Sequence, residues 1–243
     1  MMNQKSCLNC GHSVSDEFCP HCGQKTDTAR ITPKSIIKND ILGSIWHVEA
    51  RFFNTLKDII FRPGKTAMDY IAGKRIRYNN FIPLLLVLFS FNVLGLHYYE
   101  KFAPPEVLAD DSGIKDFLSR YSKAILFIII PMLAVNAYFL FRRINLNIAE
   151  HFIIGTVSLL GILTLFLLDD IVSLISLWKP VSKIFNIIDK ALFAVSVLFP
   201  ALTYWNAFKS SYTIPGLTWR IIVLYILMVS ESAVIGLILY EIF

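Results

Sequence analysis

Long uncharged stretches dominate the last two thirds of the chain, and they predict helices that span a membrane. Four of these stretches contain 17 to 19 residues without a charge, and a fifth contains 20 residues with one charge. A helix of that length extends about 26–30 Å, which matches the hydrocarbon core of a bilayer. We therefore expect an all-α membrane protein, with a helical transmembrane domain over residues 81–243. Its five expected spans cover residues 81–99, 124–141, 152–168, 191–208 and 221–240.

The third span is the shortest, because it is followed directly by Asp169 and Asp170. Extending the helix through both carboxylates would cost about 2.5–3.5 kcal/mol for each one near the bilayer centre. We therefore expect the span to end at residue 168 and residues 171–178 to form a separate interfacial helix. Four spans are the alternative to five, if one weak segment lies in the membrane interface.

Residues 29–80 predict short amphipathic helices instead of a span. Apolar residues recur at helical spacing over 36–46, 52–60 and 66–73, and Arg62-Pro63-Gly64-Lys65 interrupts the pattern. Basic helices with aromatic faces are typical of the membrane interface, but the same faces could pack against the spans as ordinary core. Both alternatives place this basic linker beside the cytoplasmic leaflet. We interpret the cations between residues 74 and 77 as topology determinants.

The composition agrees with a membrane protein and excludes a disordered chain. Of the 243 residues, 55% are hydrophobic and 17% are charged, and the mean hydropathy is +0.57. This balance argues against a soluble enzyme. Residues 1–80 hold 12 Lys and Arg against 7 Asp and Glu, whereas residues 81–243 hold 11 of each. The excess is mild, so we expect it to face anionic lipid and do not expect a nucleic-acid partner.

The first residues contain no apolar stretch of the kind that a cleaved signal peptide has, so we expect the N-terminus to remain in the cytoplasm. Five spans would then place the C-terminus outside. The connecting loops give mixed evidence for this orientation. The expected inner loops, 142–151 and 209–220, hold two cations each, whereas the outer loops, 100–123 and 169–190, hold four and three.

All four cysteines lie in the first 28 residues and predict a zinc ribbon. Cys7, Cys10, Cys19 and Cys22 form two C-x2-C pairs, which can close a tetrahedron around one structural Zn²⁺ per chain. We call each C-x2-C pair, with the loop that it forms around the metal, a knuckle. A glycine follows each pair and permits the turn that this loop requires. Eight residues separate the two pairs, fewer than the roughly 15–20 typical of zinc ribbons.

A rubredoxin-like iron site and a pair of disulfides are the alternatives to zinc. A reducing cytosol opposes disulfides. His12 and His21 lie near the site, but four cysteines complete the coordination, so we interpret both as bystanders. A closed four-cysteine site leaves no open coordination position and therefore argues against zinc catalysis.

Polar residues are sparse within the expected spans. Glu231 lies near the middle of the last one, and an intramembrane carboxylate is a candidate for function or for hydrogen-bonded packing. Asn92 and Asn136 are expected to form hydrogen bonds between helices. His97 and His151 lie at span ends, where we expect them at the interface. Catalytic and nucleotide-binding motifs are absent from the sequence, so we do not expect an enzyme.

Several motifs resemble a family of uncharacterised bacterial membrane proteins, in which a short zinc ribbon precedes a multi-pass domain of unknown function. The resemblance covers about residues 7–85. It rests on both cysteine knuckles and on Phe53-Asn54-Thr55-Leu56, Arg62-Pro63-Gly64-Lys65 and Tyr70-Ile71-Ala72-Gly73-Lys74-Arg75. It implies a ribbon-plus-spans architecture and brings no activity and no catalytic residues.

These observations favour a non-enzymatic, multi-pass protein of the bacterial inner membrane, with a cytoplasmic ribbon that serves as a docking or assembly module for a protein partner. The alternative is a small transporter or channel component that uses Glu231 in a polar path.

Overall fold

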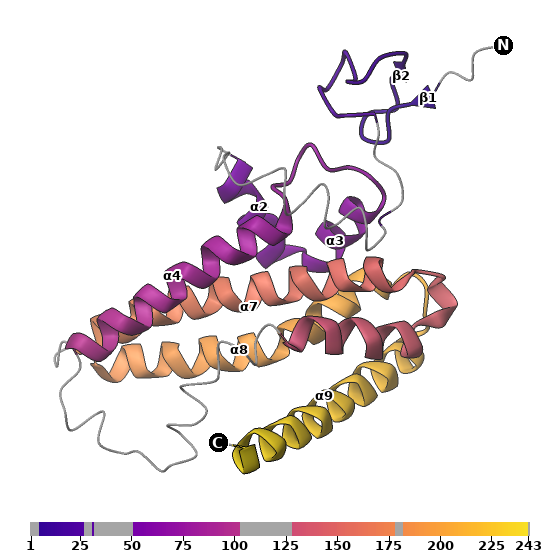
Figure 1. The fold of residues 1–243 in the computed structure, drawn as a ribbon. Coiled ribbons are helices and arrows are strands. Elements are labelled where there is room, and N and C mark those ends of the chain that lie inside the picture. The colour runs from indigo at the N-terminus through magenta and orange to yellow at the C-terminus, as the bar shows by residue number, and fades with distance from the viewer. Residues whose placement is uncertain (1–4, 27–30, 32–50, 103–127, 178–181, 243) are drawn as a thin grey trace.

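A small cysteine-rich ribbon is attached to a bundle of apolar helices in the computed structural model, which describes residues 5–26, 31, 51–102, 128–177 and 182–242 (Figure 1). The ribbon contains the antiparallel strands β1 (Lys5–Ser6) and β2 (Ser13–Val14). The helices are α2 (Arg51–Phe61), α3 (Pro63–Ile71), α4 (Phe81–Phe102), the helix Ile128–Leu140, α7 (Ile148–Ser176), α8 (Ser182–Phe208) and α9 (Ile214–Ile242). One 3-10 turn, η2 (Arg142–Ile144), follows the helix Ile128–Leu140.

Helix α7 forms the centre of the bundle and contacts α2, α3, α4 and α8. Nearly all of its first half, from Ala149 to Leu163, is buried. Gly161 allows α8 to approach closely, because the ring of Phe199 occupies the space that a side chain would need. Since α7 is apolar on every side, it is suited to the centre of a helix bundle.

The long helices α4, α7 and α9 run in one direction, and α8 runs in the opposite direction. Asn92 of α4 donates a hydrogen bond to the carbonyl of Leu163 in α7, and further along both helices Gly95 lies against Asp170. The two helices are therefore parallel. Figure 1 shows α8 running back along α7, and α9 running in the direction of α7 again.

Four described helices are long and apolar enough to cross a membrane, namely Phe81–Tyr99, Ile148–Ser176, Ile187–Phe208 and Ile214–Leu237. They contain the first, third and fourth of the expected spans and residues 221–237 of the fifth, 221–240. The second expected span, 124–141, lies partly outside the described residues, and its described part is the shorter apolar helix Ile128–Leu140. The first expected linker helix, 36–46, also lies outside the described residues.

The expected break after residue 168 is wrong, because α7 continues without interruption to Ser176. Asp170 lies over Gly95 of α4, where the missing side chain leaves room for the carboxylate. Ser173, one turn further on, donates a hydrogen bond of 3.4 Å to Asp189 of α8. The hydropathy argument treated lipid as the only neighbour of these carboxylates, whereas α4 and α8 also contact this end of α7. No separate interfacial helix forms over residues 171–176.

Helices α2 and α3 pack one face against the bundle, as the core-packing alternative predicts. Ile59 of α2 and Tyr70 of α3 are completely or almost completely buried. Gly64 brings α3 against the backbone of α8, since a side chain there would lie 2.6 Å from the carbonyl carbon of Asn206. The opposite face of α2 exposes Phe53 and Phe61.

Candidate metal centre and the polar contacts around it

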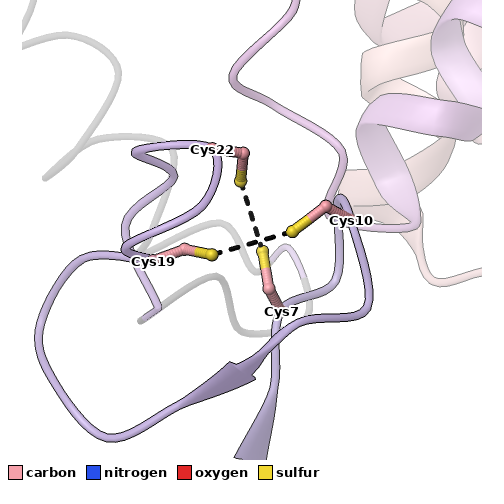
Figure 2. A group of neighbouring side chains, drawn as sticks. All are labelled: Cys7, Cys10, Cys19 and Cys22. Carbon is pink, nitrogen blue, oxygen red and sulfur yellow. Dashed lines mark hydrogen bonds between the residues drawn. The ribbon is translucent and has the colours of Figure 1, made fainter.

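The four cysteine sulfurs converge on one point between the two knuckles (Figure 2). All four Sγ atoms lie within 4.8 Å of one another. The Sγ atoms of Cys7 and Cys22 are 3.6 Å apart, and those of Cys10 and Cys19 are 3.7 Å apart. A tetrahedral metal with bonds of about 2.3 Å to sulfur requires separations of about 3.8 Å. The geometry therefore fits one four-coordinate metal ion, and the donor set of four sulfurs suits zinc or iron.

Both knuckles have the same backbone pattern, displaced by 12 residues. Gly11 donates to the carbonyl of Cys7 over 2.8 Å, and Gly23 donates to that of Cys19 over 2.9 Å. Each glycine has a positive φ, 77° and 72°, as the sequence argument requires. Cys7 and Cys19 in turn donate to the carbonyls of His12 and Gln24. The ribbon is thus two copies of one hydrogen-bonded loop around four sulfurs.

The knuckle backbone also favours the charged form of one ligand. A hydrogen bond from the backbone of Gln24 lowers the pKa of the Cys22 thiol to about 6, against an opposing effect of burial. The backbone of His12 lowers the pKa of Cys10 in the same way, but burial and the three neighbouring sulfurs together raise it to about 12. Crowded thiols resist losing several protons at once, which is the repulsion that a bound cation removes.

The two histidines lie beside the sulfur cluster and outside it. The rings of His12 and His21 stack with their centroids 5.5 Å apart, and His12 is exposed. The residues that could hold a metal among the described positions are the four cysteines. This arrangement agrees with the interpretation of both histidines as bystanders.

Gln24 attaches the ribbon to the loop that follows α3, and sequence reasoning did not predict this contact. Its side chain is 3% exposed and makes three hydrogen bonds to backbone groups. Its Nε2 donates to the carbonyl of Gly73 over 2.7 Å, while its Oε1 accepts from the amides of Arg75 and Ile76 over 3.1 and 3.2 Å. Leu8 of the first knuckle packs against Gly73, whose φ is 91°. The second knuckle thus supplies a buried amide that binds the loop through three hydrogen bonds.

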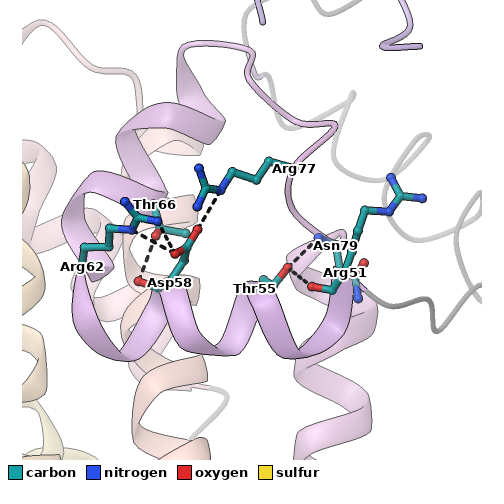
Figure 3. Close-up of polar contacts among 7 residues, drawn as sticks. All are labelled: Arg51, Thr55, Asp58, Arg62, Thr66, Arg77 and Asn79. Atoms are coloured by element: carbon teal, nitrogen blue, oxygen red, sulfur yellow. Dashed lines mark hydrogen bonds and ion pairs between the residues drawn. The ribbon is translucent and has the colours of Figure 1, made fainter. Parts of the chain in front are cut away.

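The same loop is attached to α2 through Asp58 (Figure 3). The Asp58 side chain is 7% exposed and accepts hydrogen bonds from Arg62 and Arg77, each at 2.9 Å from its Nε. Asp58 raises the pKa of the Arg62 guanidinium, first through the hydrogen bond and then through its charge. A buried carboxylate between two arginines ties α2 to the loop, so Arg77 has a structural partner in addition to its expected role in topology.

A second set of contacts connects the N-terminal end of α2 with the same loop. Thr55 is completely buried, and its hydroxyl donates to the carbonyl of Arg51 over 2.8 Å and accepts from the amide of Asn79 over 3.1 Å. Arg51 donates to the carbonyl of Ile76 over 3.2 Å. Figure 3 shows the contacts of Thr55 beside those of Asp58 along α2. The loop before α4 is therefore fixed to α2 at two points.

The intramembrane candidate Glu231 has a partner on another helix. Asn136 donates from Nδ2 to Oε2 of Glu231 over 2.8 Å, and Asn136 itself is 6% exposed. Asn92 donates to the carbonyl of Leu163 over 3.0 Å. Both asparagines therefore connect helices, as their positions predicted.

His151 differs from its expected place at the interface. It is completely buried near the start of α7, between the rings of Tyr138 and Phe208, with centroids 6.3 and 6.2 Å away. Neither ring nitrogen has a hydrogen-bond partner in the structure. The sequence pattern shows only that His151 lies at the end of an apolar stretch. It does not show that neighbouring helices bury the side chain.

A tyrosine hydroxyl is inserted into the backbone of α8 beside Pro200. Tyr225 of α9 accepts from the amide of Ala201 over 3.1 Å and donates to the carbonyl of Val197 over 2.7 Å. In an unbroken helix this amide would bond that carbonyl directly. An apolar cavity of about 200 Å³ borders the same residues and extends to Phe166 and Met228. The hydroxyl of Tyr225 therefore replaces the backbone hydrogen bond that is lost beside Pro200.

Cations gather at one end of the bundle, which we call the ribbon end. Here α4, α7 and α9 begin, the helices Ile128–Leu140 and α8 end, and the loop bound by Gln24 lies. The described cations of this end, outside the ribbon, are Arg51, Lys57, Arg62, Lys65, Lys74, Arg75, Arg77, Arg142, Arg143, Lys209 and Arg220. The described acids there are Asp58, Asp69 and Glu150. The described part of the opposite end includes Asp169, Asp170 and Asp189, together with Lys101 and Lys190.

Comparison with known families finds one similarity. Residues 49–93 match the model of a family described as a protein of unknown function (DUF3667). The match supports the similarity to an uncharacterised family that the sequence motifs indicated. It covers α2, α3, the loop and the first half of α4, and it therefore includes Gly64, Asp58 and Arg77. No curated protein and no solved structure matches the chain.

Proposed function

We propose that this chain is a non-enzymatic, multi-pass protein of the bacterial inner membrane, and that its cytoplasmic ribbon is an assembly module stabilised by one structural Zn²⁺. The observation that carries the proposal is the attachment of the four-sulfur ribbon to the membrane domain through Gln24. A structural metal supplies folding energy to a segment too short to form an apolar core. That energy also fixes Gln24, so metal binding supports the conformation of the loop and, through Asp58, of α2.

The outward face of the ribbon is available to a protein partner. Phe18 is 55% exposed on the ribbon, and the stacked rings of His12 and His21 lie beside the metal ligands. Aromatic side chains on a rigid support contribute strongly to protein interfaces, because they bury a large area at little entropic cost. The ribbon would thus have one face bound to its own membrane domain and another that docks a partner.

The attachment can be tested with trypsin, because the bound loop contains Lys74, Arg75 and Arg77. Gln24→Ala removes all three hydrogen bonds and should increase cleavage in this loop several-fold, while the zinc content stays unchanged. The matched control is His12→Ala, at the equivalent position of the first knuckle, which should cleave like the wild type. Equal cleavage of the two variants would refute the attachment role.

Metal and partner binding need separate measurements. Metal analysis should find about one zinc per chain, and the double variant Cys10→Ser, Cys22→Ser should lose it; iron in its place would contradict the zinc assignment.

Affinity purification in mild detergent should recover a partner with the wild type. Phe18→Ala should lose that partner while retaining zinc. If the metal-free double variant recovers the same partner equally well, the ribbon is not the docking module.

A second candidate function is supported by the pairing of Glu231 with Asn136, which places a carboxylate and an amide together between apolar helices. In this alternative the chain is a small transporter or channel component with a polar path. Glu231→Gln retains hydrogen bonding but removes the titrating group. A folded, normally abundant variant that behaves like a deletion would support transport, whereas an unchanged phenotype would support packing.

A further inference from the structure

A hollow at the ribbon end lies along the connection between the helix Ile128–Leu140 and the start of α7. Its lining residues are Tyr138, Arg142, Asn145, Leu146, Asn147 and Ile148, and its volume is about 770 Å³. The lining combines one guanidinium and two side-chain amides with apolar surface. This combination suits an amphiphile, with a charged group near Arg142 and an apolar chain beside it.

Unlike Arg62 and Arg77, Arg142 has no described carboxylate partner. Arg62 and Arg77 are both engaged by Asp58. The guanidinium of Arg142 instead lies over the rings of Tyr138 and Phe139, with its central carbon 5.9 and 5.3 Å from their centroids. Stacking on aromatic rings orients a guanidinium and leaves its N–H groups available to an anion.

The start of α7 does not itself supply the anion site. Glu150 accepts a hydrogen bond from the amide of Asn147, and the Asn147 side chain accepts one from the amide of Glu150. This capping box already satisfies amides at the helix N-terminus and adds a negative charge there. An anion in the hollow must therefore be held mainly by the guanidinium of Arg142.

The surroundings of the hollow identify the class of ligand. Phe139 is 60% exposed, and Val135 and Ile148 are also exposed, so apolar surface continues from Arg142 along the outside of the bundle. We propose that the hollow binds an anionic phospholipid, with its phosphate on Arg142 and its acyl chains along Val135 and Phe139. The proposal rests on the membrane location in the proposed function and is independent of the role of the ribbon.

Adjacent arginines provide a matched test. Arg143 carries the same charge one residue further along and is exposed, but it does not line the hollow. The purified full chain, Arg142→Gln and Arg143→Gln should be titrated with phosphatidylglycerol in detergent, and retained lipids should be counted by native mass spectrometry. Phosphatidylcholine with the same acyl chains serves as the uncharged reference. Losing a charge-assisted contact to phosphate should weaken phosphatidylglycerol binding by about tenfold in Arg142→Gln.

The expected result is a preference for phosphatidylglycerol that persists in Arg143→Gln and disappears in Arg142→Gln, with both variants binding phosphatidylcholine like the wild type. Equal losses in the two variants would overturn the proposal, because diffuse attraction by the cationic end would then explain binding. A wild type without preference for phosphatidylglycerol would overturn it too. Competition by millimolar inorganic phosphate would identify a site for free phosphate in place of lipid. None of these outcomes changes the zinc or trypsin results, so the ribbon proposal is tested separately.

Discussion

Substituting Gly64 by alanine tests the closest contact between the linker and the membrane bundle. Gly64 belongs to the Arg-Pro-Gly-Lys motif at the start of α3. A Cβ atom at this position would lie 2.6 Å from the carbonyl carbon of Asn206, and closer still to the backbone of Thr203 and Ala207. All three neighbours are backbone atoms of α8, so no side chain can rotate away. Helix α3 must move by roughly 1 Å, because ordinary contacts of this kind begin near 3.4 Å.

Two opposing effects determine the change in unfolding free energy. Overpacking a well-packed contact costs about 1–3 kcal/mol, and the movement also strains the 3.0 Å hydrogen bond from the Lys65 amide to Asn206. Alanine is otherwise better than glycine in a helix by about 0.5–1 kcal/mol. The clash is the larger effect, so we expect a net loss of about 1–2 kcal/mol, which lowers the unfolding midpoint by about 2–8 °C.

Gly236 of α9 provides the control, because a Cβ atom there would have no neighbour within 4 Å. Gly236→Ala should leave the midpoint unchanged or raise it slightly. Both variants can be compared with the wild type by thermal unfolding in one detergent, followed through the intrinsic fluorescence of the 4 tryptophans. Equal midpoints for Gly64→Ala and Gly236→Ala would refute the packing of α3 against the α8 backbone.

Two further predictions concern the charges of the ribbon end and the topology. Asp58→Asn should destabilise the chain by about 1–2 kcal/mol, because two arginines lose their buried carboxylate, although both are substantially exposed and water screens part of the effect. Asp69→Asn, which removes the surface pair with Lys74, should change the unfolding free energy by less than about 0.5 kcal/mol, and comparable losses would show that burial of Asp58 is not decisive. For the topology, a reporter fused after Lys5 should read cytoplasmic and one fused after Phe243 should read periplasmic, whereas both ends on one side would favour four spans.

The features that could be predicted from the sequence are those set by local spacing. Runs without charge located the long helices, and two C-x2-C pairs located the four sulfurs that converge. Each depends on residues a few positions apart, where the geometry of a helix or knuckle fixes which side chains share a face. The same reasoning cannot identify partners that meet only in the folded chain. Gln24 binds a loop about 50 residues away, and Asn136 meets Glu231 across 95 residues.

The errors at Asp169 and His151 have one physical origin. Both predictions treated a polar residue near the end of an apolar run as if its surroundings were either lipid or water. In the bundle each residue also has other helices as neighbours, which offer space over Gly95 for Asp170 and the rings of Tyr138 and Phe208 for His151. A hydropathy window averages over all sides of a helix, so it cannot distinguish the side that faces protein. The surroundings of buried polar residues in the spans are therefore the feature that a sequence pattern predicts least well.

The distribution of charge over the folded bundle also supports an orientation that separate loops left undecided. Counted loop by loop, the expected outer loops hold more cations than the inner ones. In the fold, the linker cations join Arg142, Arg143, Lys209 and Arg220 at one end, together with the ribbon. Positive charge near span ends favours the cytoplasmic side. This charge distribution is the one expected if, as proposed above, the ribbon end faces the cytoplasm, a reducing compartment in which thiols persist and disulfides do not form.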